Sequence, residues 1–263
     1  MNVLLLTDFS STANHAMKYT SILLRDKAAK ITLMHVKKPC SGDSCSGKCN
    51  TIFESKLNKD LRFLKGKNNP LHQLNTYFVE GQYLDSIRDF VRSQDIDLII
   101  VGNSHQHQIE DDLDLDKKTV DVITKVNCPV LLVSKNTSLK SPKKLLLPTD
   151  FSINVEHKVF SVLSEIYDFS EKNIDLLSVQ NNRELTQIQL TTKQKINEVL
   201  SNIGIQKISE NHISSAKKCA SVGYDTIVML AKNLSVFNLV FSTKINSAKQ
   251  ICHNNLPMLF LHG

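Results

Sequence analysis

Residues 3–10 read VLLLTDFS and residues 145–152 read LLLPTDFS, and this repeated stretch decides how the chain is organised. The shared Thr-Asp-Phe-Ser tetrad begins at Thr7 and begins again at Thr149. Two further segments recur in the same order, residues 97–101 at 225–229 and residues 127–133 at 255–261. Segments that recur in the same order indicate two homologous halves, which we place at residues 1–138 and 143–263.

Each half alternates short apolar runs with longer amphipathic ones. The apolar runs are rich in leucine and β-branched residues, as strands are, and they are residues 2–7, 30–36, 74–79, 97–102, 129–133, 144–148, 173–179, 205–210, 225–230 and 257–261. Helical patterns of the first half occupy residues 11–25, 51–64, 83–93 and 119–126. The expected caps of the first helix are Ser10 or Ser11, and those of its counterpart are Ser152 or Asn154. We therefore expect an α/β fold in which each half is a five-stranded parallel sheet covered on both faces.

The first half carries an insertion. Fewer residues separate Asp97 from Asp225 than separate Thr7 from Thr149. Part of the first half therefore has no counterpart in the second, and we place that part between residues 37 and 78. The insertion contains a cysteine-rich loop, residues 39–50, which holds three of the six cysteines, Cys40, Cys45 and Cys49. Since the first apolar run is too short for a secretory signal, we expect metal or redox chemistry from these thiols rather than structural disulfides.

The composition is that of an ordinary globular chain. Its 263 residues are 41% hydrophobic and 22% charged, and the formal net charge is +6. No apolar run approaches the ~20 residues of a membrane span. Basic segments interleaved with aromatic residues do not occur in the sequence either, which disfavours nucleic-acid binding. We therefore expect a cytoplasmic protein with neither a nucleic-acid nor a membrane partner.

Four segments resemble the universal stress protein family. They are the Thr-Asp-Phe-Ser turn after the first strand, His35-Val36 at the second, residues 97–102 at the fourth and residues 128–133 at the fifth. The resemblance covers nearly the whole chain as a tandem pair, and the second half is the more divergent. It implies a flavodoxin-like (Rossmann-like) fold, adenine-nucleotide binding, and roles in stress tolerance or signalling. It also implies self-association through the fifth strands, either within one chain or between two.

The residues that bind ATP in this family are largely missing. The resemblance implies a Gly-x2-Gly-x9-Gly-Ser/Thr motif after the fourth strand, whose glycines let backbone amides reach the phosphates. Gly102 matches the first glycine, but His105 stands at the second and residues 115–117 read Leu-Asp-Lys where Gly-Ser is expected. In the second half the replacements are Leu230, Asn233 and residues 241–244. The carboxylates in residues 110–116 would also repel a triphosphate, so we expect weak or no ATP binding.

Asp8 and Asp150 match the aspartate that contacts the nucleotide in this family. Together with Gly102 they are the candidate cofactor-binding residues. Each aspartate also stands just before a helix, where it could serve instead as a cap or a turn residue. The sequence leaves both roles open.

The cysteine-rich loop is a candidate metal site with Cys-x4-Cys-x3-Cys spacing. Thiolates suit Zn²⁺ and Cu⁺, but a structural zinc site needs a fourth ligand. The loops after the second and fourth parallel strands emerge at the same sheet edge, so His105 or His107 could complete the set. His35, otherwise a hydrogen-bonded structural histidine, becomes a ligand only if the loop folds back. Two alternatives stay open, namely thiols that are oxidised reversibly and a polar loop with no specific role.

We expect a non-enzymatic stress-response or signalling protein with degenerate nucleotide sites, a metal- or thiol-sensing loop, zinc as the candidate metal and an unidentified protein partner. No nucleophile elbow, Walker loop or metalloprotease helix occurs in the sequence, so no residue is assigned a catalytic role. One alternative is an ATP-binding member with weak ATPase activity that acts through Asp8 and Gly102. The other is a protein that cycles its clustered thiols.

Overall fold

The computed structural model describes residues 1–40, 48–67, 69–103, 115–167, 173–179, 184–205, 207–212, 223–233, 236 and 256–262. Three of the candidate metal ligands, Cys45, His105 and His107, lie outside these residues.

The elements follow the predicted alternation of strands and helices. In the first half they are β1 (Asn2–Leu6), α1 (Ser11–Leu23), β2 (Ala29–Lys37), α2 (Lys48–Lys65), β3 (His72–Glu80), α3 (Tyr83–Ser93), β4 (Leu98–Asn103), α4 (Lys117–Lys125) and β5 (Val130–Ser134). In the second half they are β6 (Lys144–Thr149), α5 (His157–Ile166), β7 (Asn173–Ser178), α6 (Gln187–Asn202), β8 (Ile208–His212), β9 (Thr226–Leu230) and β10 (Met258–Leu261).

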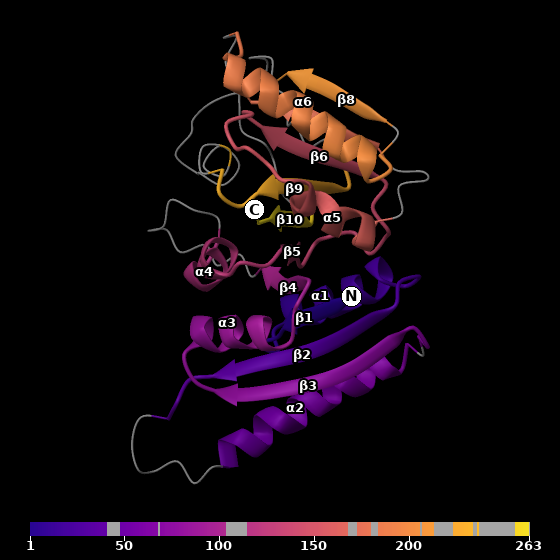
Figure 1. The fold of residues 1–263 in the computed structure, drawn as a ribbon. Coiled ribbons are helices and arrows are strands. Elements are labelled where there is room, and N and C mark those ends of the chain that lie inside the picture. The colour runs from indigo at the N-terminus through magenta and orange to yellow at the C-terminus, as the bar shows by residue number, and fades with distance from the viewer. Residues whose placement is uncertain are drawn as a thin grey trace.

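The ten strands of the described residues form one sheet in the order β3-β2-β1-β4-β5-β10-β9-β6-β7-β8 (Figure 1). All pairings within each half are parallel, and β1–β5 and β6–β10 follow the same order. The halves meet where β5 runs antiparallel to β10, with Leu131 opposite Leu259. The predicted α/β fold with a five-stranded parallel unit in each half is confirmed, and the two units share one continuous sheet.

Alternation along the strands divides the core between the two faces of the sheet. In β1, Val3 and Leu5 join one apolar cluster while Leu4 and Leu6 join the other, because successive strand residues point to opposite faces. Helices α1, α2, α5 and α6 contribute to the first cluster, and α3 and α4 contribute to the second. None of the described helices is both long enough and apolar enough to cross a membrane.

The predicted caps are right in the first half and wrong in the second. Ser10 caps α1, and its side chain accepts a hydrogen bond from Ala13 N. The N-cap of α5 is Glu156, which makes no side-chain capping bond. Both predicted caps are engaged elsewhere, because Ser152 Oγ donates to Asp150 Oδ1 and Asn154 Oδ1 accepts from Lys195 Nζ.

Two predictions about the insertion need correction. The cysteine-rich loop does not extend to residue 50, because α2 begins at Lys48 and Cys49 is helical. The extra residues also do not all lie between residues 37 and 78. By strand pairing, Ile31 matches Ile174, Leu74 matches Ile208 and Leu98 matches Thr226, so the offset between matching residues falls from 143 to 134 and then to 128. Part of the shortening therefore comes after β3 begins.

Candidate functional site

The Thr-Asp-Phe-Ser tetrad folds into the same turn in both halves. Thr7 Oγ1 accepts a hydrogen bond from Phe9 N at 3.0 Å, and Asp8 Oδ1 accepts one from Ser10 N at 2.9 Å. The same two bonds are both 3.0 Å long in residues 149–152. The phenylalanine has a positive φ, 65° in the first half and 56° in the second, a conformation that side-chain bonds of this kind support. The repeated tetrad is therefore a structural connection between strand and helix.

The two candidate aspartates differ in what else surrounds them. Asp150 Oδ1 also accepts a hydrogen bond from Asn233 Nδ2 at 2.7 Å, and Asn233 is buried. Since Asn233 stands where the family motif has a glycine, a side chain of the chain itself occupies this part of the second half. Asp8 instead lines an open cleft in the first half.

That cleft has a volume of about 390 Å³ and lies where β1, β2 and β4 end and α4 begins. The polar and small residues that line it include Asp8, His35, Tyr83, Gly102, Asp116, Lys117 and Lys118. It occupies the carboxyl edge of a parallel sheet, which is where open α/β folds bind their ligands.

Gly102 is required by the packing of α1 on β4. A Cβ at this position would lie 2.8 Å from the carbonyl carbon of Thr12 and 2.9 Å from Ala13 N. Both neighbours are backbone atoms, which cannot rotate away as a side chain would. The glycine that matches the family motif therefore has a structural reason that involves no phosphate.

A carboxylate caps the N-terminus of α4. Asp116 Oδ1 accepts a hydrogen bond from Thr119 N at 3.1 Å, and Oδ2 accepts one from Thr119 Oγ1 at 2.6 Å. A helix N-terminus with open amides is a favourable place for a phosphate, and here it already faces a negative charge. Burial, and then the charges of Asp116 and Asp8, raise the pKa of Tyr83. Lys117 and Lys118 add positive charge to the same cleft.

His35 lies within an aromatic stack beside the cleft. Its Nδ1 is 2.8 Å from the carbonyl oxygen of Thr7, and because a carbonyl only accepts, Nδ1 carries the proton. The His35 ring is 4.5 Å from the Phe9 ring and 4.8 Å from the Phe53 ring. Burial lowers the pKa of His35, so the ring is neutral at pH 7. The expected structural role of His35 agrees with this geometry.

Two of the clustered cysteines are in contact. Cys40 follows β2, Cys49 lies in the first turn of α2, and their sulfurs are 3.7 Å apart. The Lys37 ammonium lies beside them and donates to Glu80 Oε2 at 2.8 Å and to Asn50 Oδ1 at 2.9 Å. The hydrogen bond to Glu80, and then the interactions with the Cys40 and Cys49 side chains, raise the pKa of Lys37. Two thiols and one ammonium thus converge at the carboxyl end of β2.

The predicted metal site is only partly within the described residues. Cys40 and Cys49 are brought together, whereas Cys45, His105 and His107 lie outside the described part of the chain. Within the described part, no three His, Cys, Asp or Glu side chains gather to hold a metal ion. The contribution of Lys37, Glu80 and Asn50 was missed from the sequence, because each residue falls just outside a predicted strand or helix (residues 30–36, 74–79 and 51–64).

Comparison with known proteins decides the family. The sequence model of the universal stress protein family matches residues 1–134. The chain belongs to the universal stress protein family. Members of this family are stress-response proteins. No curated protein matches the chain significantly.

Two solved structures, the first of them a universal stress protein, share the fold over nearly the whole chain. One from Archaeoglobus fulgidus has a TM-score of 0.69 at 14% identity, covering 99% of this chain and 98% of that one. A protein of unknown function from Pseudomonas aeruginosa has a TM-score of 0.51 at 10% identity, covering 99% of this chain and 92% of that one. At such low identity these similarities show the fold alone.

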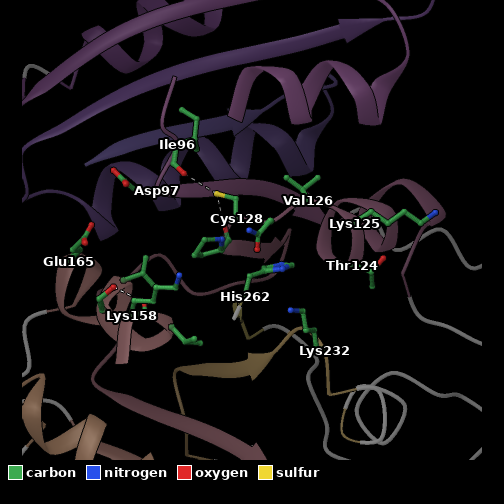
Figure 2. Close-up of a pocket in the computed structure, with 15 residues that line it drawn as sticks. Ile96, Asp97, Thr124, Lys125, Val126, Cys128, Lys158, Glu165, Lys232 and His262 are labelled. Carbon is green, nitrogen blue, oxygen red and sulfur yellow. Dashed lines mark hydrogen bonds between the residues drawn. The ribbon is translucent and has the colours of Figure 1, made fainter. Parts of the chain in front are cut away.

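A second cavity of this universal stress protein lies at the seam between the halves. It has a volume of about 570 Å³, and Figure 2 shows Cys128 of the first half near His262 and Lys232 of the second. Cys128 Sγ donates to Ile96 O at 3.3 Å, and burial raises the pKa of this thiol to about 12. The thiol is therefore unreactive.

Proposed function

We propose that this universal stress protein is a non-enzymatic stress-response protein that senses zinc through the cysteines at the carboxyl edge of its first half. The observation that carries the proposal is the 3.7 Å separation of Cys40 Sγ and Cys49 Sγ. Two thiolates on a tetrahedral zinc ion lie about 3.8 Å apart, since each Zn–S bond is ~2.3 Å long. The pair therefore already has the spacing of two zinc ligands.

The complete ligand set in this proposal is Cys40, Cys45 and Cys49 with His105 or His107. The roles of Cys45 and the two histidines are proposed from the sequence, where they follow β2 and β4. These two strands flank β1 in the sheet, which supports a site that bridges their loops. Three thiolates around Zn²⁺ leave one negative charge, and the Lys37 ammonium is placed to offset it.

Metal analysis tests the proposal directly. The protein is purified without chelator or metal-affinity resin, and its zinc is measured per chain by elemental analysis. We expect about one zinc per chain, with most of it lost in the Cys45→Ser and Cys49→Ser variants. A Cys128→Ala variant serves as the matched control, because its thiol is buried at the seam, and it should keep the metal. Equal zinc in all four proteins would contradict the proposal.

We propose further that ATP is not the physiological ligand of this chain. The carboxylate of Asp116 at the start of α4 and the Asn233–Asp150 bond in the second half support this view. The alternative, an ATP-binding protein with weak ATPase activity, is favoured by the open cleft around Asp8 and Gly102. Equilibrium binding of a fluorescent ATP analogue separates the two, since micromolar affinity would support the alternative.

The remaining features of the proposal concern partners and location. Because β5 and β10 pair within the chain, we propose that the two halves satisfy each other and that the protein is a monomer in the cytoplasm. It would signal through a protein partner, with no nucleic-acid or membrane partner. Light scattering should give the mass of one chain, 29.6 kDa. A mass twice as large would show a homodimer instead.

A further inference from the structure

We infer that Cys40 and Cys49 are an oxidative modification site, at which hydrogen peroxide converts the two thiols into a reversible disulfide. The inference deepens the proposed function and rests on it, because it names what regulates the same cysteines.

The positions of the two sulfurs favour this pairing. At 3.7 Å they are in contact, and a disulfide of about 2.05 Å requires them to approach by less than ~2 Å. Cys40 lies beyond the end of β2 and is exposed, so peroxide can reach its sulfur. Cys49 is held in α2. The bond can therefore form through movement at Cys40 while the strand and the helix stay in place.

A cation and a helix N-terminus lie beside the two sulfurs. The Lys37 ammonium interacts electrostatically with both thiols, and its side chain is only 9% exposed. Cys49 also lies at the N-terminus of α2, and the first turn of that helix contains no acidic residue. Ammonium groups and helix N-termini are the features that make cysteines reactive. Glu80 offsets part of the Lys37 charge, which lessens this effect without removing it.

The reaction balances with peroxide as the only oxidant. The Cys40 thiolate attacks one peroxide oxygen, the O–O bond breaks, and hydroxide leaves with a proton as water, so that Cys40 becomes a sulfenic acid. The Cys49 sulfur then attacks the Cys40 sulfur, the S–O bond breaks, and a second water leaves with the Cys49 proton. The two thiols lose two electrons and two protons, and one peroxide is reduced to two waters. A dithiol reductant reverses the reaction by thiol–disulfide exchange.

Oxidation would also remove two of the proposed zinc ligands at once. A disulfide sulfur carries no charge and is a poor ligand, because the thiolate is the form that binds metal. Zinc binding and the disulfide are therefore mutually exclusive at this site. The site would respond to oxidant by releasing its metal.

Peptide mapping of the full chain tests the inference. The metal-free protein is treated with hydrogen peroxide, its free thiols are alkylated, and it is digested with trypsin. Cleavage after Lys48 separates Cys49 from the other two cysteines of the loop. We expect the peptide that contains Cys40 to be joined to the one that begins at Cys49, and to be released by dithiothreitol. The linkage should vanish in Cys40→Ser and persist in Cys45→Ser.

A rate measurement adds a test that does not depend on the cysteine variants. We expect Lys37→Gln to slow disulfide formation about tenfold, as loss of a neighbouring cation does for reactive thiols, and Lys37→Arg to restore most of the rate. Alkylation of all three loop cysteines after peroxide treatment, or a linkage that persists in Cys40→Ser, would overturn the inference. The zinc proposal fails separately, when the untreated protein holds no metal. The Cys45→Ser variant distinguishes the two, since it should lose zinc and keep the disulfide.

Discussion

At Gly102 the absence of a side chain leaves room for the backbone of α1. A glycine that matches a ligand-binding motif can therefore be required by packing alone. Its position matches the first glycine of the family's nucleotide motif, yet Thr12 and Ala13 already press against it. A sequence records only that glycine is present. It does not record whether a ligand or a helix lies against the position.

Gly102→Ala is expected to lower the free energy of unfolding by about 2 kcal/mol, the usual size of an overpacking effect, because its Cβ would lie 2.8 Å from backbone. Urea denaturation measures this. Gly81→Ala is the matched control, since its Cβ would meet the movable hydroxyl of Ser86 at 2.9 Å. An equal loss in the two variants, or no loss in Gly102→Ala, would speak against a packing role.

Individual residues were predictable where local chemistry is sufficient. The Ser10 cap and the structural role of His35 follow from their neighbours in the chain. The roles of Asp8 and Asp150 stayed open, because the choice between a turn and a ligand depends on what else approaches the carboxylate. Asn233 approaches Asp150 from a distant part of the chain, and no local pattern reveals that contact.

Among the helices, α4 combines structural and functional constraints at its N-terminus. Asp116 contributes a cap that stabilises the helix and a charge that opposes phosphate binding. These two contributions can be separated, since serine also caps helices but carries no charge.

Asp116→Ser is therefore expected to change stability by less than ~1 kcal/mol while raising the affinity for a fluorescent ATP analogue about fivefold, the effect of one nearby unit charge in a partly solvated cleft. Fluorescence titration at constant ionic strength measures the affinity. Asp121→Ser removes an equal negative charge from α4, but from a carboxylate that pairs with Lys125. This variant should leave the affinity unchanged. If Asp116→Ser and Asp121→Ser bind the ATP analogue with equal affinity, the carboxylate of Asp116 is not what weakens nucleotide binding.

Elements were predicted well in position and less well at their ends. Hydrophobic periodicity located the strands, because burial on both faces leaves a continuous apolar run. It did not locate the start of α2, where Lys37 Nζ donates to Asn50 Oδ1 and ties the first turn to β2. Cys49 lies in this first turn, and its sulfur contacts that of Cys40.

At the scale of the whole molecule, the antiparallel pairing of β5 and β10 joins the halves and places the half-buried His262 at their seam. His262 Nε2 is buried with no hydrogen-bond partner among the described residues. Burial, and then the charge of Lys232, lower the pKa of His262 from 6.5 to about 4. The sequence predicted that fifth strands pair in this family, but not which side chains the pairing would enclose.

This titration gives the chain a specific pH dependence. Between pH 4 and 6.5 the unfolded chain binds a proton at His262 that the folded chain does not, so stability is full above pH 6.5 and falls as the pH drops toward 4. We expect His262→Gln to reduce that fall by roughly 1–2 kcal/mol. Urea denaturation of both proteins at pH 4.5 and 7.5 measures the difference. If the free energy of unfolding falls equally with pH in the wild type and in His262→Gln, the fold does not lower the pKa of His262.

X-ray absorption at the zinc edge of the purified chain tests the central claim, that the cysteines beyond β2 form the functional site. We predict a first shell of three sulfurs at about 2.3 Å and one nitrogen at about 2.0 Å, and loss of the sulfur signal after peroxide treatment. A shell made only of oxygen and nitrogen, or a chain without zinc, would contradict the account.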